Sequence, residues 1–139
     1  MSTPNLPITK LADKPSTQAP RWGVPVEELL GRWKNVKENT QLIDTVDIEL
    51  ENDTIYITAF GKGETTPIDW GKQACQLFYD AVDSNAVEGL MANYDFGFME
   101  NLICFNAKKG VLTIQSYSIF KDDSGRKDYF GREFFTKIN

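Results

Sequence analysis

The chain has 139 residues, a formal net charge of −5 and a pI near 4.7. Its length fits one domain with a single hydrophobic core. Its acidic balance argues against a nucleic-acid partner or an anionic membrane surface, since both attract basic faces. The sequence contains no histidine, which removes the most common general base and transition-metal ligand. We therefore expect neither a metal site nor a cofactor.

The two cysteines, Cys75 and Cys104, each have apolar neighbours in the sequence. We expect buried free thiols, with a disulfide as the alternative. The first residues are polar and rich in proline, without the apolar segment of a secretion signal, and no apolar run approaches the ~18 residues of a membrane span. The sequence thus predicts a cytoplasmic protein without membrane insertion and leaves its oligomeric state open.

Residues 1–24 contain four prolines among Ser, Thr, Lys and Gln. Such a segment buries too little apolar area to offset its ordering entropy, so we predict a flexible N-terminal tail. Trp22 is the exception within this tail. It either folds back onto the wall of the domain or serves as a lid residue or partner anchor.

Residues 25–30 predict a single helical turn. Pro25 has a fixed φ suited to the first helical position, and two glutamates follow it at the positive end of the helix dipole. Gly31 then releases the chain, and residues 32–37 alternate polar and apolar side chains as a half-buried strand does. A helical turn that leads into a strand beginning Gly31-x-Trp33 suits the plugged end of a closed antiparallel barrel.

The rest of the chain predicts further strands joined by turns rich in Gly, Asp and Asn. One stretch, residues 73–82, fits helical spacing as well as strand alternation, and the barrel context favours a strand. Residues 111–120 carry polar and apolar side chains on both faces, which suits a partly polar interior. The predicted fold is all-β, an up-and-down antiparallel barrel of about eight strands over residues 25–139 that can hold one small ligand. The further strands are 45–50, 54–60, 73–82, 86–94, 97–106, 111–120 and 129–137.

The Gly31-x-Trp33 motif, the preceding helical turn and the successive hairpins resemble the calycin superfamily, which comprises lipocalins, fatty-acid-binding proteins and avidins. In lipocalins a late arginine stacks on the motif tryptophan, and the resemblance gives this role to Arg126 or Arg132. Three further motifs are similar to a group of small bacterial Gly-x-Trp domains, a likeness that implies no activity. They are Asp69-Trp70-Gly71, Phe96-Gly97-Phe98-x-Glu100 and Asp123-Ser124-Gly125-Arg126.

Two carboxylates are candidates for chemistry. Asp69 could accept a ligand hydrogen bond or act as a base while Trp70 stacks on the ligand; alternatively, Asp69 caps a turn and Trp70 covers the core. Glu100 shares a face with apolar residues by alternation, so it either faces solvent through a register break or is buried. A buried Glu100 would serve a ligand or form an ion pair with Arg126 or Arg132. Inward-pointing tyrosines would offer hydroxyl groups to a ligand, and otherwise they are ordinary wall residues. The candidates are Tyr56, Tyr79, Tyr94 and Tyr117.

Three functions follow from these patterns. The first is a binding protein that holds a small apolar or aromatic molecule inside the barrel. The second is a biosynthetic cyclase, isomerase or lyase that positions its substrate and moves a proton with Glu100, Asp69 or a tyrosine. The third is a protein-interaction barrel with a packed interior. The first two require a cavity of a few hundred Å3 with convergent polar groups.

Overall fold

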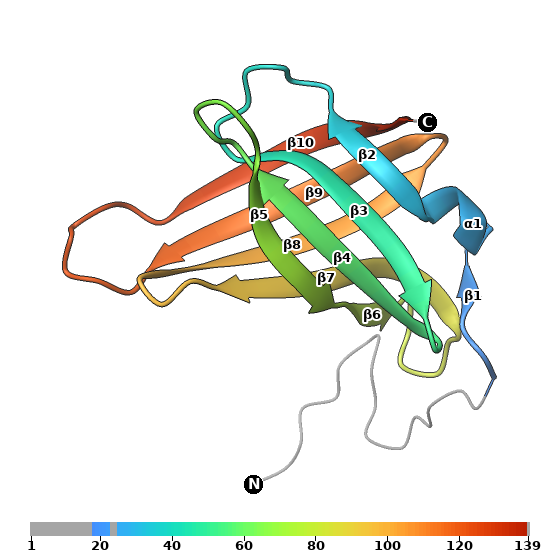
Figure 1. Cartoon of the computed structure of the whole chain (residues 1–139). Coiled ribbons are helices and arrows are strands. Elements are labelled where there is room, and N and C mark those ends of the chain that lie inside the picture. The colour runs from blue at the N-terminus through green and yellow to red at the C-terminus, as the bar shows by residue number, and fades with distance from the viewer. Residues whose placement is uncertain (1–17, 23–24, 139) are drawn as a thin grey trace, which may run out of the picture.

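The structure is a computed structural model that describes residues 18–22 and 25–138. Within these residues it contains one short helix and ten strands, which form a single curled sheet (Figure 1). The all-β prediction is therefore confirmed. The elements are β1 (Arg21–Trp22), α1 (Val26–Leu29), β2 (Gly31–Asn35), β3 (Ile43–Glu51), β4 (Thr54–Gly61), β5 (Ile68–Ala74), β6 (Gln76–Tyr79), β7 (Ala86–Asp95), β8 (Met99–Lys108), β9 (Val111–Phe120) and β10 (Tyr129–Ile138).

The sheet has the strand order β1-β7-β8-β9-β10-β2-β3-β4-β5, and β6 also pairs with β7. All pairs are antiparallel except that of β1 with β7. Because β10 pairs with β2, strands from the two ends of the domain lie side by side. The sheet curls so that β2–β5 face β7–β10 across a common interior (Figure 1).

Strands β5 and β6 are one extended segment interrupted at Cys75. The segment pairs with β4 through β5 and with β7 through β6, so it crosses from one side of the curled sheet to the other. At the interruption, the Cys75 N–H donates to the Ile55 carbonyl at 2.8 Å. Residues 73–79 therefore belong to strands apart from Cys75, as the barrel context predicted, and residues 80–85 form the turn into β7.

Side chains fill the middle of the curled sheet. The largest fully buried residues come from several strands and include Trp33, Tyr94 and Phe135. On the inner face of β9, Leu112 and Ile114 lead to Ser116 and Ser118, so one end of the interior is apolar and the other is partly polar. The Asn101 side-chain amide donates to the Ser118 hydroxyl at 2.8 Å in the polar part.

Helix α1 covers the apolar end of the interior and connects to β2 through a hydrogen bond. The Trp33 indole N–H donates to the Leu29 carbonyl at 2.9 Å, and both residues are buried. Gly31 begins β2 with a φ of +120°, which side chains rarely allow. The sequence predicted Pro25 as the first residue of the helix. In the structure, Pro25 is instead the N-cap residue of α1. No helix in the described part of the chain is long and apolar enough to cross a membrane.

Part of the predicted flexible tail forms strand β1. The Arg21 N–H donates to the Asn85 carbonyl at 2.6 Å, and Trp22 packs partly buried against the core. Trp22 thus folds back onto the domain, which was one of its two predicted roles. The remainder of that prediction concerns residues 1–17 and 23–24, which lie outside the described residues.

We expect Trp33→Phe to lower the free energy of unfolding by about 2–3 kcal/mol, because it removes core volume and leaves the Leu29 carbonyl without its donor. Urea denaturation followed by circular dichroism measures the change. Tyr79→Phe is a matched control because Tyr79 is 41% exposed, and we expect a change of less than about 0.5 kcal/mol. Equal stability of the two variants would contradict the role assigned to Trp33.

Candidate functional site

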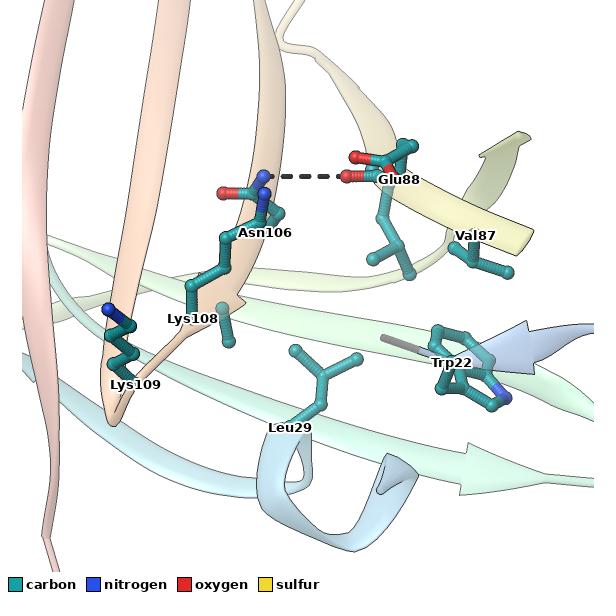
Figure 2. Close-up of a pocket in the computed structure, with 10 residues that line it drawn as sticks. Trp22, Leu29, Val87, Glu88, Asn106, Lys108 and Lys109 are labelled. Carbon is teal, nitrogen blue, oxygen red and sulfur yellow. Dashed lines mark hydrogen bonds between the residues drawn. The ribbon is translucent and has the colours of Figure 1, made fainter. Parts of the chain in front are cut away.

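A cavity of about 370 Å3 lies at the end of the sheet that α1 covers. We call it the α1 pocket. It is lined by Trp22, Leu29, residues 87–90 of β7, and residues 106–109 of β8 and the turn that follows. Figure 2 shows Trp22 and Leu29 facing this space from two different elements. The volume falls within the lower part of the range typical of small-ligand sites.

The α1 pocket forms where β7 and β8 separate. Their ladder ends at the pair Leu90 and Phe105. Beyond this pair, the Asn106 side-chain amide donates to the Glu88 carbonyl at 3.4 Å, a long hydrogen bond that bridges the two strands (Figure 2). Strand β1 pairs with the first two residues of β7 and brings Trp22 to the opening. The local loss of strand pairing therefore creates the space that Trp22 borders.

The lining of the α1 pocket combines an apolar interior with a polar rim. Leu29 and Leu90 are almost fully buried, and they meet the half-buried side chain of Trp22. Exposed Lys108 and Lys109 lie along the rim, and neither forms an ion pair with a described residue. Such a pocket suits a molecule with an apolar body and a polar or anionic group. The remaining lining residues are Val87, Glu88, Gly89, Asn106 and Ala107.

Asp69 and Trp70 occupy structural positions outside the lining of the α1 pocket. The Asp69 carboxylate accepts a hydrogen bond from the Gly71 N–H at 2.8 Å, closing an exposed Asx turn. The Trp70 ring packs edge-on against Tyr94 with 5.5 Å between ring centroids. A Cβ at Gly61 would collide with the Trp70 indole. These contacts match the alternative in which Asp69 caps a turn and Trp70 covers the core.

Glu100 lies on the outer face of β8 and contacts a lysine. In β8 the alternate positions 101, 103 and 105 are buried, so Glu100 lies on the other side of the strand and faces outward. Its carboxylate lies 3.5 Å from Lys121 Nζ, which also contacts Asp95 at 2.8 Å. The hydrogen bond from Lys121 lowers the pKa of Asp95. The prediction that Glu100 pairs with an arginine is therefore wrong. The β8–β9 register pairs Met99 with Phe120, which brings Lys121 to the turn between β7 and β8.

Tyr94 is the one candidate tyrosine that is buried in the interior. Its hydroxyl accepts from the Ala59 N–H at 3.0 Å and lies 2.9 Å from the Gly71 carbonyl oxygen, so it joins β7 to β4 and β5. Burial raises the pKa of Tyr94 to about 12, and the hydroxyl stays protonated at neutral pH. The other three candidates are at least partly exposed and do not line the α1 pocket: Tyr56, Tyr79 and Tyr117.

The cation next to Trp33 is a lysine and not an arginine. The β10–β2 register pairs Lys137 with Trp33, and Lys137 Nζ lies 5.2 Å from the indole centroid. Arg126 and Arg132 lie over phenylalanine rings elsewhere. The arginine stacking that the calycin resemblance implied is therefore wrong for this chain. Strand register places Arg132 opposite Gln115 of β9, and Arg126 lies in the loop between β9 and β10.

Both cysteines are free thiols, and each is half-buried. Burial raises the pKa of the Cys75 thiol to about 12, and it also raises the pKa of Cys104. Neither thiol is therefore ionised at neutral pH, which makes both poor nucleophiles. Within residues 18–22 and 25–138, no three His, Cys, Asp or Glu side chains converge as a metal site would require.

The chain matches no protein-family model, no curated protein and no solved structure. Apart from Trp22, for which a lid or anchor role was one of two predictions, the pocket-lining residues were not predicted as binding residues from the sequence. Trp22 carried a signal, because it is an aromatic residue in an otherwise polar segment. Lys108 and Lys109 were predicted only as part of a turn, since nothing in their local sequence indicates that α1 and β1 lie beside them.

We expect Tyr94→Phe to lower the free energy of unfolding by about 1–3 kcal/mol at neutral pH, because the Ala59 N–H and the Gly71 carbonyl lose a buried partner. Folding raises the pKa of Tyr94 to about 12. The stabilisation is therefore complete below the unfolded pKa of about 10 and is lost as the pH rises toward the folded pKa. Urea denaturation at about pH 8 and about pH 11 measures this change. If the difference in unfolding free energy between wild type and Tyr94→Phe does not shrink as the pH rises, the assigned role of the Tyr94 hydroxyl is contradicted.

Proposed function

We propose that this protein is a calycin-like up-and-down barrel that binds a small molecule with an apolar or aromatic body in the α1 pocket. The observation that carries the proposal is the cavity of about 370 Å3 in which Trp22, Leu29 and Leu90 meet below a rim with two lysines. An apolar body would displace water from these side chains, and burial of apolar area would supply most of the affinity.

The proposal places the ligand at one end of the barrel and not in its middle. The middle is occupied by buried side chains such as Trp33, Tyr94 and Phe135. At the pocket rim, Lys108 and Lys109 are positioned to attract an anionic group, whereas Glu88 is the one carboxylate in the lining. The excess of positive charge favours a ligand whose polar group is negatively charged.

We infer a binding function without proton transfer. Neither Asp69 nor Glu100 lines the α1 pocket, and each carboxylate already has a partner in a turn or an ion pair. The hydroxyl of Tyr94 is likewise engaged by backbone groups and stays protonated at neutral pH. None of these three candidates thus supplies an acid or base at the cavity.

Trp22→Ala should weaken the binding of N-phenylnaphthylamine, a neutral aromatic probe, by about 10-fold, because the pocket loses its largest apolar side chain. Fluorescence titration of the purified protein measures the dissociation constant. Tyr56→Ala is the matched control, since it removes a partly exposed aromatic ring outside the pocket, and it should change the constant less than about 2-fold. If Trp22→Ala binds the probe as wild type does, the α1 pocket is not the binding site.

Lys108→Glu should discriminate between two probes that share an aromatic body. We expect it to weaken the binding of anilinonaphthalene sulfonate, which carries a negative charge, by about 5- to 10-fold at low ionic strength. The affinity for neutral N-phenylnaphthylamine should stay almost unchanged. Lys127→Glu is the control, because it makes the same charge change outside the pocket lining. Equal effects of the two substitutions would show that net charge, and not the rim lysine, governs anion binding.

Native mass spectrometry of freshly purified protein is a separate experiment that would identify a co-purifying molecule.

A further inference from the structure

The outer surface of the sheet has two chemically different halves. The outward-facing side chains of β2–β5 form ion pairs that suit exposure to water. Arg32 lies 2.7 Å from Asp47, and Lys72 lies 2.6 Å from Glu51. By contrast, Arg132 is the only charged side chain among the described outward-facing positions of β9 and β10. The outer face of β9 and β10 is thus unusually apolar for a water-exposed sheet. Charged side chains return at one end of the β7–β8 pair, where Lys121 contacts Asp95 and Glu100.

We define the β6–β10 face as the outward side of strands β6 to β10. Five of its large apolar side chains are between 39% and 55% exposed: Phe78, Tyr117, Ile119, Phe130 and Phe134. The rings of Tyr117 and Phe130 are in contact, with centroids 5.3 Å apart, and half-buried Leu102 is paired in register with Tyr117. Contiguous exposed aromatic residues of this kind are typical of protein–protein interfaces.

A groove of about 440 Å3 crosses the β6–β10 face. The strand registers place Met91, Cys104, Gln115 and Arg132 in one row across β7, β8, β9 and β10. Arg132 borders the groove at the β10 side, and Glu88 borders it at the β7 side. Neither side chain forms an ion pair with a described residue. The groove is thus apolar or neutral along its length and carries opposite charges at its two sides.

We propose that a second copy of this chain binds to the β6–β10 face in a two-fold symmetric dimer. In a two-fold interface both copies use the same surface. If one residue contacts a second residue of the other copy, the reverse contact forms as well. A groove with Glu88 at one side and Arg132 at the other is self-complementary under such a rotation. The Arg132 of each copy would pair with Glu88 of the other, and the groove centre near Cys104 and Gln115 would lie at the axis.

The size of the face is appropriate for this partner. Four strands of ten residues each, together with β6, cover a projected area of about 700 Å2 at the usual strand spacing and rise. Each partner of a standard protein interface contributes about the same area. Arg132 also lies over the Phe134 ring at 5.8 Å, and arginine and aromatic residues are enriched at the centres of interfaces.

Sedimentation velocity of the full chain over a series of micromolar concentrations tests the proposal. We expect wild type to dimerise reversibly. Arg132→Glu and Glu88→Arg should each weaken the dimer by at least about 10-fold, since each places two like charges together. The double variant should recover most of the wild-type affinity because the pair is restored with its polarity reversed. Glu38→Arg, which makes the same charge change as Glu88→Arg in the loop between β2 and β3, should have little effect.

A monomeric wild type at all concentrations up to about 100 μM would overturn the proposal, since interfaces of this size are usually far tighter. A dimer in which the double variant is no tighter than the single variants would also overturn it. Because probe binding in the α1 pocket is measured separately, failure of the dimer leaves the proposed function in place, and the reverse also holds.

Cross-linking of the unmodified chain gives a second measurement that needs no charge variant. Burial raises the pKa of Cys104 and slows its alkylation, so the reaction is run for several hours with an excess of a short bismaleimide. The reagent should join two copies through Cys104, with one thioether formed at each end of the linker, because Cys104 lies near the proposed axis. The product should persist in Cys75→Ser and disappear in Cys104→Ser. Cross-linking that does not depend on Cys104 would place the contact between copies on another surface and overturn the proposal.

Discussion

The hydrogen bond from the Trp33 indole to the Leu29 carbonyl couples helix α1 to strand β2. It fixes the single helical turn over the end of the interior, and a four-residue helix has too few internal hydrogen bonds to hold that position alone. Leu29 packs in the hydrophobic core and also lines the α1 pocket. The contact that holds α1 over this end of the curled sheet therefore also shapes the cavity beside it.

A second set of contacts joins the two sides of the curled sheet to each other. The strand segment that contains Cys75 passes from β4 to β7, and Tyr94 joins β7 to β4 and β5 through backbone hydrogen bonds. Both residues are used to close the interior, and burial keeps both protonated. A centre closed and filled in this way leaves little space for a ligand, which explains why the cavity lies at the end where β7 and β8 separate.

The same separation of strands affects the inside and the outside of the protein. Glu88, Gly89 and Asn106 line both the α1 pocket and the groove of the β6–β10 face. The two sites are thus divided by a thin part of the wall, in which one long side-chain hydrogen bond replaces a strand ladder. The proposed ligand site and the proposed dimer surface therefore lie back to back in this half of the molecule.

Most of the strands were predictable from the sequence because side-chain alternation and turn residues are local signals. Residues 111–120 form β9 as predicted, and the helical turn before Trp33 was also recognised. Strand register was not predictable, since it depends on contacts between distant segments. Register decided that Lys137 and not an arginine lies beside Trp33, and that Glu100 meets Lys121. The α1 pocket likewise required tertiary structure, because its lining joins Trp22 and Leu29 to residues far along the chain.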